Sequence, residues 1–255
     1  MKAPNEILLV WNQFNSFPME TLTKAWYFEK TSGKKQRDVS LMREHHEQYG
    51  IAGNCFDLSI WLLNEFNKVG VNAYPIGHNL HTPKAHVGVI ALGEKGERYF
   101  CDLGDQWLQP ILIDCENSMY IPDKLAGYFP AAEVQIEQQD KKVVIHYYRP
   151  NGKASKQTFD PTPIEWSEFR EAAEFSQNFI KPNPLLECRI PYKNEIAHFE
   201  FYNFESFLST SEGKFYDSKL NSAEEWGERI SEKTGYDVDF VHEALTIYQK
   251  IKVMQ

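Results

Sequence analysis

The spacing of apolar residues along the chain separates helical stretches from strand-like ones. Residues 1–54 show mostly helical, charged patterns with a polar break at 31–35. Apolar side chains then recur at the helical period over residues 55–69, and Gly70 ends that pattern. Strand-like stretches follow at 71–76, 86–92 and 98–103, with a polar loop expected at 77–84. The chain is therefore predicted to begin with helices and to continue into antiparallel strands.

Turn and cap signals divide the remainder into hairpins and helices. Asn151-Gly152 lies between two strand-like stretches, which is a strong short-range sign of a hairpin. Ser222 is a good N-cap and Gly235 a good stop for one C-terminal helix. Strands are expected at 134–138, 141–148, 186–192, 195–203 and 206–220, and helices at 165–180, 223–233 and 238–251. Strand groups set apart from helices in this order are typical of an α+β fold.

Composition and charge exclude several classes of protein. The 255 residues are 42% hydrophobic and 25% charged, which is ordinary for a globular chain. The formal net charge is -9 with basic residues spread out, so no nucleic acid or anionic membrane partner is expected. Neither a membrane span nor a signal peptide is expected. The cysteines lie far apart and are expected to be free thiols in a reducing cytoplasm: Cys55, Cys101, Cys115 and Cys188.

Cys55 is the strongest candidate for chemistry because it opens a predicted helix. The unpaired N–H groups at a helix start, together with the helix dipole, favour a thiolate over a thiol. Gly53 allows a sharp entry into the helix and a close approach of a substrate. A nucleophilic thiolate also needs a base, and the base needs a group that orients it.

The hairpin that follows supplies both groups. His86 begins its first strand and Asp102 ends its second. A bulged turn near Lys95 would place these residues directly opposite each other on one face, with Cβ atoms ~5 Å apart. The aspartate is then expected to hold the imidazole by its Nδ1–H group. A cysteine, a histidine and an aspartate at a helix start, a strand start and an opposing strand end favour a catalytic triad over three structural residues.

A metal site is not expected in this region. His78 and His81 lie near His86 in sequence, but no cysteine or carboxylate completes a known ligand spacing. His78 is instead expected to be a solvated residue of the 77–84 loop.

The candidate residues lie in three blocks that resemble those of a known family. Residues 53–59 read GNCFDLS, residues 86–89 HVGV and residues 101–104 CDLG. They are similar to the catalytic blocks of the arylamine N-acetyltransferases, R-G-G-x-C-F-E-x-N, H-x-x-L-x-V and V-D-V-G-F-G. The resemblance implies an α+β, cysteine-proteinase-like architecture: a helical domain with the nucleophile (1–80), an antiparallel β-barrel with the histidine and aspartate (81–180), and an α/β lid (181–255).

The resemblance also implies a chemistry. Acetyl-coenzyme A would donate an acetyl group to Cys55, and a small-molecule amine would then accept it. His86 would act as base and then acid, and Asp102 would orient it. The amide of Cys55 and the side chain of Asn54 are candidates for the oxyanion hole, and Gly104 and Asp105 are candidates for the lining of the substrate pocket.

Three departures from the family pattern affect these expectations. Ile51-Ala52 replaces Arg-Gly, and Asp57 and Ser59 replace Glu and Asn, so the turn before Cys55 must be braced differently. Asp105 replaces an aromatic residue in the third block. A carboxylate there either faces a polar or cationic acceptor or lies exposed in a turn.

Two other functions fit the same triad. The blocks also resemble the wider transglutaminase-like superfamily, in which such a site serves amide hydrolysis or amine transfer. The segment 159–235, which a bare transglutaminase-like core does not require, favours the acetyltransferase. The third hypothesis is a binding protein that keeps the three residues without catalytic turnover, because a shared fold alone does not decide the chemistry.

Overall fold

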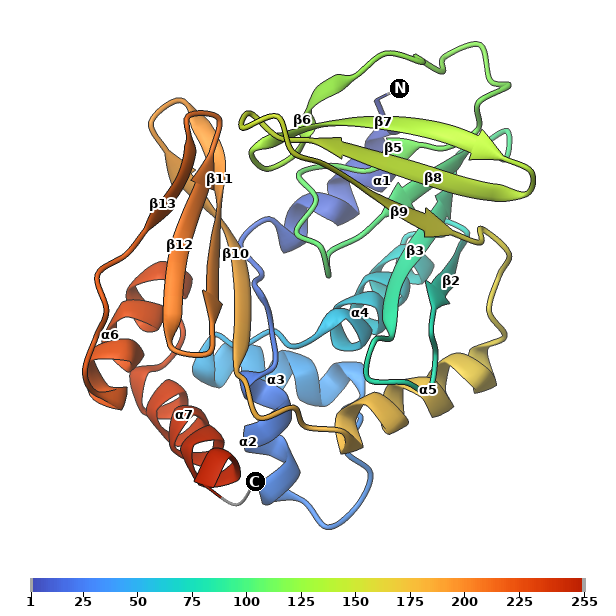
Figure 1. Ribbon diagram of the computed structural model, residues 1–255. Coiled ribbons are helices and arrows are strands. Elements are labelled where there is room, and N and C mark those ends of the chain that lie inside the picture. The colour runs from blue at the N-terminus through green and yellow to red at the C-terminus, as the bar shows by residue number, and fades with distance from the viewer. Residues whose placement is uncertain (1, 254–255) are drawn as a thin grey trace.

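The computed structural model describes residues 2–253 and has the predicted α+β fold (Figure 1). The helices are α1 (Asn5–Trp11), η1 (Asn12–Phe14), α2 (Leu22–Lys30), α3 (Val39–Tyr49), α4 (Cys55–Lys68), α5 (Trp166–Asn178), α6 (Ala223–Thr234) and α7 (Val238–Val253). The first part of the chain is helical, the middle part is antiparallel sheet, and the last part is a sheet covered by helices. No helix within the described residues combines the length and apolarity that crossing a bilayer requires.

The strands form three antiparallel sheets. One contains β2 (Ala73–His78), β3 (His86–Leu92), β4 (Arg98–Cys101) and β5 (Ile111–Leu112). The next contains β6 (Leu125–Phe129), β7 (Ala132–Gln139), β8 (Lys142–Tyr148) and β9 (Ala154–Phe159). The third has the order β1 (Met19–Glu20), β10 (Leu185–Tyr192), β11 (Glu195–Tyr202), β12 (Glu205–Thr210) and β13 (Gly213–Tyr216).

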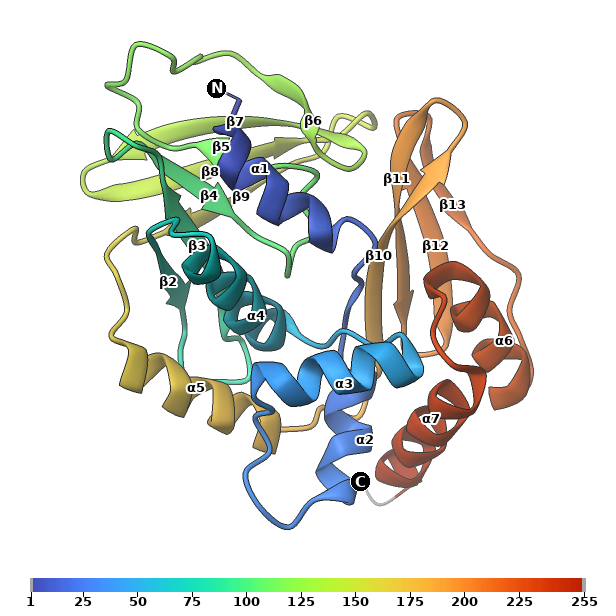
Figure 2. The same cartoon turned by 180° about the vertical axis from the view of Figure 1, so that it is seen from behind.

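Two hydrophobic cores hold these layers together. The larger one joins α1 and α4 to the two four-stranded sheets, and Trp11, Phe56 and Trp107 are fully buried in it. The smaller one joins α2 to β10, β11, α6 and α7 around Trp226 and Tyr248. Seen from either side, α4 lies between the five-stranded sheet and strands β2 and β3 (Figures 1 and 2). The start of α4 therefore lies where the layers meet.

The structure corrects two local predictions. The single strand expected at 206–220 is the hairpin of β12 and β13, which turns before Gly213, a residue with φ of 133°. The loop expected from Gly77 starts later, because β2 continues through His78, which pairs with His86. Strands β1 and β5 have two residues each, too few to show a period of two. Ser222 and Gly235 cap α6 as expected.

Candidate active site

Cys55 is the first residue of α4, and the cap of that helix fixes its position. Asn54 is the N-cap, and its Oδ1 accepts hydrogen bonds from the N–H groups of Phe56 (2.9 Å) and Asp57 (3.2 Å). Asp57 returns the contact by accepting from the Asn54 N–H (3.2 Å), which completes a capping box. The half-buried thiol thus lies at the positive end of the α4 dipole.

The turn before the helix admits only glycine at position 53. Its φ is 144°, and a Cβ there would overlap the Asp57 carboxylate. The Gly53 carbonyl also accepts a hydrogen bond from the Glu20 N–H (2.9 Å), which ties the turn to β1. The chain is therefore held from both sides immediately before Cys55.

An arginine from the α2–α3 loop braces this turn, in place of the arginine absent at position 51. Arg37 donates to the Ala52 carbonyl (2.6 Å) and lies 3.5 Å from Asp57, and both charged side chains are 2% exposed. The amides of Gln36 (2.9 Å) and Gln177 (3.0 Å) also donate to the Asp57 carboxylate. The bracing thus comes from segments far from residues 51 and 52, which the sequence did not indicate.

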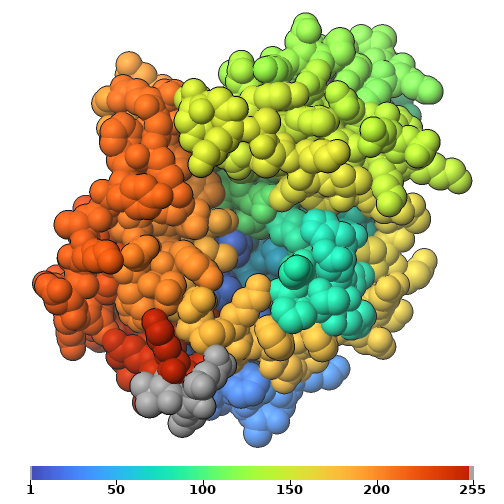
Figure 3. Space-filling view, in the orientation of Figure 1, coloured from blue at the N-terminus to red at the C-terminus, as the bar shows by residue number. Residues whose placement is uncertain are grey.

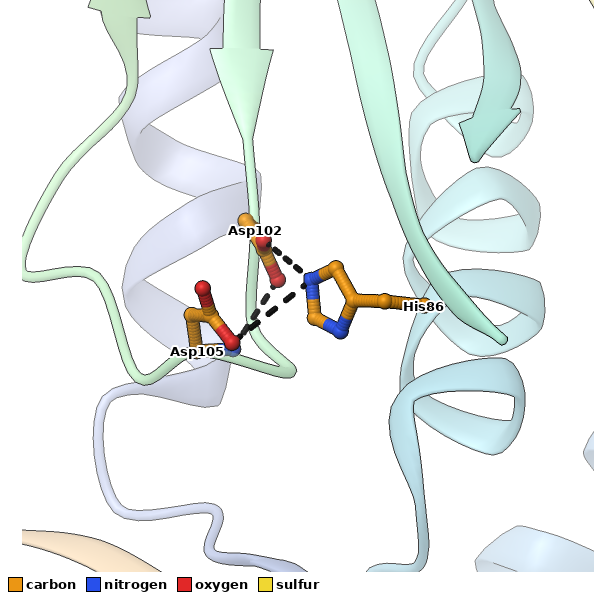
Figure 4. A group of neighbouring side chains, drawn as sticks. All are labelled: His86, Asp102 and Asp105. Carbon is orange, nitrogen blue, oxygen red and sulfur yellow. Dashed lines mark hydrogen bonds and ion pairs between the residues drawn. The ribbon is translucent and has the colours of Figure 1, made fainter. Parts of the chain in front are cut away.

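The structure brings His86 and Asp102 together, but not in the predicted register. Val89 pairs with Cys101; continuing that pairing places Gly88, not His86, across from Asp102. His86 therefore reaches Asp102 diagonally, and its Nε2 lies 2.7 Å from Oδ2 (Figure 4). The true register differs from the predicted one by two residues, an even number, so both side chains still share one face.

The orientation of the imidazole is also the reverse of the prediction. Asp102, which is fully buried, contacts Nε2 rather than Nδ1. Nδ1 points away from both carboxylates drawn in Figure 4. A hydrogen bond between His86 and Cys55 contributes to raising the pKa of the imidazole. The histidine thus contacts its carboxylate through one nitrogen and leaves the other available to Cys55.

Gly104 lies against all three residues of this group. A Cβ at Gly104 would be 2.7 Å from the Cβ of Cys55, 3.0 Å from Cε1 of His86 and 3.1 Å from Oδ1 of Asp102. The first distance is shorter than real Cβ atoms show, and the other two are tighter than most Cβ contacts. Glycine at 104 therefore keeps the space in which the three side chains meet.

Asp105 follows in the same turn and faces inward rather than into solvent. Its Oδ1 lies 3.6 Å from His86 Nε2, and its Oδ2 accepts from the Gln157 amide (2.7 Å). Its own N–H donates to Asp102 (3.0 Å), and its side chain is 23% exposed. Of the two alternatives for Asp105, the structure therefore contradicts the exposed turn residue. Asp105 is a second carboxylate on the same imidazole (Figure 4).

The two carboxylates decide the charge of the histidine. Burial alone would lower the pKa of His86, but the charges of Asp102 and Asp105 and hydrogen bonds with Asp102 and Cys55 outweigh it. The pKa of His86 therefore lies well above its ordinary value. At neutral pH the ring is an imidazolium, the form that pairs with a thiolate.

A cavity of about 330 Å³ opens onto this group. Cys55, His86, Asn54 and Asp105 line it, together with Lys24 and Glu187, which the sequence did not single out. Figure 3 shows the surface hollowed between the five-stranded sheet, in orange, and the cyan segment that carries His86. The sulfur is thus reachable by a small molecule from this side.

Two groups of described residues have the composition of a metal site. One is His86, Asp102 and Asp105 itself, whose potential ligand atoms lie within 4.8 Å of one another. The other is Glu187, His198 and Glu200. His78 belongs to neither, and its ring packs beside Phe159 at the end of β2 instead of in a solvated loop.

Comparisons with known proteins agree on the fold. No family model and no curated protein matches the sequence. Among solved structures, the arylamine N-acetyltransferase of Salmonella typhimurium superimposes with a TM-score of 0.70 over 95% of this chain and 89% of its own, at 14% identity. The enzyme of M. tuberculosis gives 0.70 over 96% and 91%, at 13% identity. The Mycobacterium marinum enzyme in complex with CoA gives 0.69 over 94% and 90%, at 10% identity. The chain therefore has the arylamine N-acetyltransferase fold over nearly its whole length.

Proposed function

We propose that the protein is an acyltransferase that moves an acetyl group from acetyl-coenzyme A through Cys55 to a small-molecule amine. The observation that carries this proposal is the meeting of Cys55, His86 and Asp102 at the cavity wall around Gly104. The fold supports it, because structures with this fold include an arylamine N-acetyltransferase in complex with CoA. The segment after the triad, β10 to α7, is part of that match.

In the first half-reaction Cys55 takes the acyl group. Its thiolate attacks the thioester carbonyl carbon, and the carbonyl oxygen becomes an oxyanion. The N–H of Cys55 points out of the first turn of α4, and Asn54 lines the same cavity with its Oδ1 already engaged in the cap. Both are candidate donors to that oxyanion. The coenzyme A thiolate then leaves with the proton of the His86 imidazolium.

In the second half-reaction the amine releases the acyl group. The now neutral His86 accepts a proton from the amine as its nitrogen forms the bond to the acetyl carbon. The bond between that carbon and the Cys55 sulfur breaks, and the thiolate and imidazolium are restored. Asp102 keeps the ring oriented throughout, because Nε2 stays hydrogen-bonded to it.

The other cysteines are poorly suited to this role. Burial raises the pKa of Cys188 to about 12 and that of Cys101 further, so both remain thiols at neutral pH. Cys115 is half-buried, as Cys55 is, but it lies away from the cavity lining. Cys115 is therefore the matched control for the nucleophile.

The test is intact mass spectrometry of the protein mixed with acetyl-coenzyme A. We expect an increase of about 42 Da, one acetyl group, that survives in Cys115→Ala and disappears in Cys55→Ala. The Cys55→Ala change removes little packing, so circular dichroism should show an intact fold. An adduct that persisted in Cys55→Ala would place the nucleophile elsewhere and end the proposal.

The same measurement separates the two competing functions. A transglutaminase-like enzyme would form its adduct from a glutamine-containing peptide with release of ammonia, and not from the thioester. A binding protein with an idle triad would form neither adduct. Alkylation of Cys55 by iodoacetamide at pH 6 would then report whether the thiolate is present.

A further inference from the structure

A second cavity, of about 530 Å³, adjoins the one that holds Cys55. Asp105 and Glu187 line both cavities, so the two cavities meet at these side chains. The second cavity lies between β10–β13 and the β9 region, where Figure 3 shows the orange and yellow surfaces separated by a hollow. A molecule that passed Asp105 and Glu187 would reach from the Cys55 sulfur into the second cavity.

Three polar side chains converge on the wall of the second cavity. Glu187 on β10 pairs directly with Glu200 on β11, and His198 lies two residues before Glu200 on the same face. One potential ligand atom from each lies within 4.8 Å of the others. We call Glu187, His198 and Glu200 the distal cluster. It lies outside the group formed by Cys55, His86 and Asp102.

The distal cluster has acceptors but no donor to match them. His198 Nε2 is buried and lacks a hydrogen-bond partner among the described residues; its nearest carboxylate oxygen, on Glu187, is 3.9 Å away. Burial lowers the pKa of His198 to about 4, so the ring is neutral and Nε2 can accept a hydrogen bond. A buried acceptor without a donor is unfavourable unless a ligand supplies one.

Among the described residues, the two carboxylates of the cluster also lack a paired cation, although Arg149, Lys153 and Lys214 line the same cavity. Burial, with the charges of Asp105 and Glu200, raises the pKa of Glu187 well above its ordinary value. Within residues 2–253, neither glutamate of the cluster forms an ion pair with a lysine or arginine. Lys214, whose charge acts to lower the pKa of Glu200, lies over the ring of Phe207 instead of forming an ion pair with Glu200. The distal cluster is therefore suited to a cation that arrives from outside.

We propose that the distal cluster binds the second ammonium group of a diamine or polyamine acceptor while its other amine reacts at Cys55. This rests on the proposed function, and it names the acceptor class. A primary ammonium has three N–H donors, and Glu187, His198 and Glu200 present three acceptors. The reacting nitrogen attacks as the free amine and forms the amide bond, the carbon–sulfur bond breaks, and one proton goes to His86. The second ammonium keeps its charge throughout.

The test compares putrescine with butylamine, which has the same carbon chain and a single nitrogen. In the wild type we expect kcat/KM for putrescine to exceed that for butylamine by roughly tenfold or more, as for a charge-assisted hydrogen-bond site. Glu200→Gln should collapse that ratio toward one. Glu195→Gln, which removes the same charge from the same strand but outside the cluster, should preserve it. The proposal would be overturned if the wild type had equal kcat/KM values for putrescine and butylamine, or if the ratio of the two values were unchanged in Glu200→Gln.

A divalent metal ion is the competing occupant, since two carboxylates and an imidazole are also metal ligands. The ratio should be unchanged after dialysis against EDTA. Zinc ion should raise the Tm of the wild type no more than that of Glu200→Gln. If EDTA removed the preference, or if zinc ion selectively stabilised the wild type, the distal cluster would be a metal site and the proposal would fail.

Failure of the proposed acyltransferase function can be distinguished from failure of the distal cluster as a binding site. Acetyl-Cys55 is measured without any amine, so its absence would count against the acyltransferase and not against the distal cluster. Calorimetric titration of the unacetylated protein with putrescine would then test by itself whether the distal cluster binds an ammonium group. We expect binding in the wild type and Glu195→Gln that weakens in Glu200→Gln, and no difference among the three would refute the site.

Discussion

Two groups of charged side chains lie near Cys55, and only in one of them is a carboxylate paired with a cation. Behind the turn that precedes Cys55, the Asp57 carboxylate meets the Arg37 guanidinium and two side-chain amides. Across the cavity, Glu187 pairs with Glu200 on the next strand, beside the neutral imidazole of His198. Arg149, Lys153 and Lys214 line the same cavity, but within residues 2–253 neither glutamate forms an ion pair with a lysine or arginine. Both regions contain carboxylates, yet only the first pairs its carboxylate with a cation.

The difference follows from what each region faces. Arg37 and Asp57 are enclosed by protein and line neither of the two cavities, so every donor and acceptor must be satisfied internally. Glu187 lines both cavities, where a ligand can complete its contacts. A buried carboxylate that is paired with a cation of the chain stabilises the fold. A carboxylate that lines a cavity without such a partner indicates a place for a ligand. The predictions below test this distinction.

The largest effect is expected from Arg37→Met. It would leave the Asp57 carboxylate buried without a cation and free the Ala52 carbonyl, which should cost about 3–5 kcal/mol of unfolding free energy in urea. Arg43→Met is the control, because the Arg43–Glu65 pair is partly exposed and should be worth about 0–1 kcal/mol. A loss below about 1 kcal/mol for Arg37→Met would mean that the turn does not depend on this pair.

The sequence was most informative where a pattern is local. The helix that begins at Cys55 and the caps Ser222 and Gly235 were predicted because capping depends on neighbouring residues. The hairpin of His86 and Asp102 was predicted by its alternation and turn. Its register was wrong because the loop length, and not the side-chain pattern, sets the pairing.

The parts that the sequence could not reveal depend on distant segments. Arg37 reaches the turn at Ala52 from another loop, and no spacing signals such a contact. Gln177 had a usable signal: it follows Phe169 and Ala173 at intervals of four on the buried face of α5, where a polar residue needs a partner. The distal cluster needs the pairing of β10 with β11, which brings Glu187 beside Glu200 only after folding.

A smaller effect is expected from Asp105→Asn, which removes one of the two carboxylates that raise the pKa of His86. The pKa of His86 should be lower in this variant than in the wild type, because the charge of Asp102 alone then opposes the effect of burial. Attack of the amine on the acetyl-enzyme needs neutral His86, so the acid limb of its pH–rate profile should move to lower pH.

Single-turnover reaction of pre-acetylated protein, read across pH, measures this limb. Asp140→Asn removes a carboxylate from an exposed turn between β7 and β8 and should leave the limb in place. An unchanged limb in Asp105→Asn would show that Asp105 does not influence the base. The substitution Asp105→Phe, compared on anilines and on cationic amines, asks the separate question of whether Asp105 helps to choose the acceptor.

The smallest effect, and the most direct contrast with Arg37→Met, is expected from Glu200→Gln on stability. Burial raises the pKa of Glu200 above its ordinary value of 4.5. Between 4.5 and the higher folded value the folded protein holds more protons than the unfolded chain, so its stability falls as pH rises through that window. Glutamine has no charge to desolvate. Glu200→Gln should therefore be neutral near pH 4 and stabilising at pH 8, by about 0.5 kcal/mol because solvent screens this half-buried group.

Urea unfolding at the two pH values, with Glu195→Gln as the control, measures this difference in the free energy of unfolding. Destabilisation at pH 8 would mean that the fold itself needs the Glu200 carboxylate, and the contrast between the two buried groups would disappear.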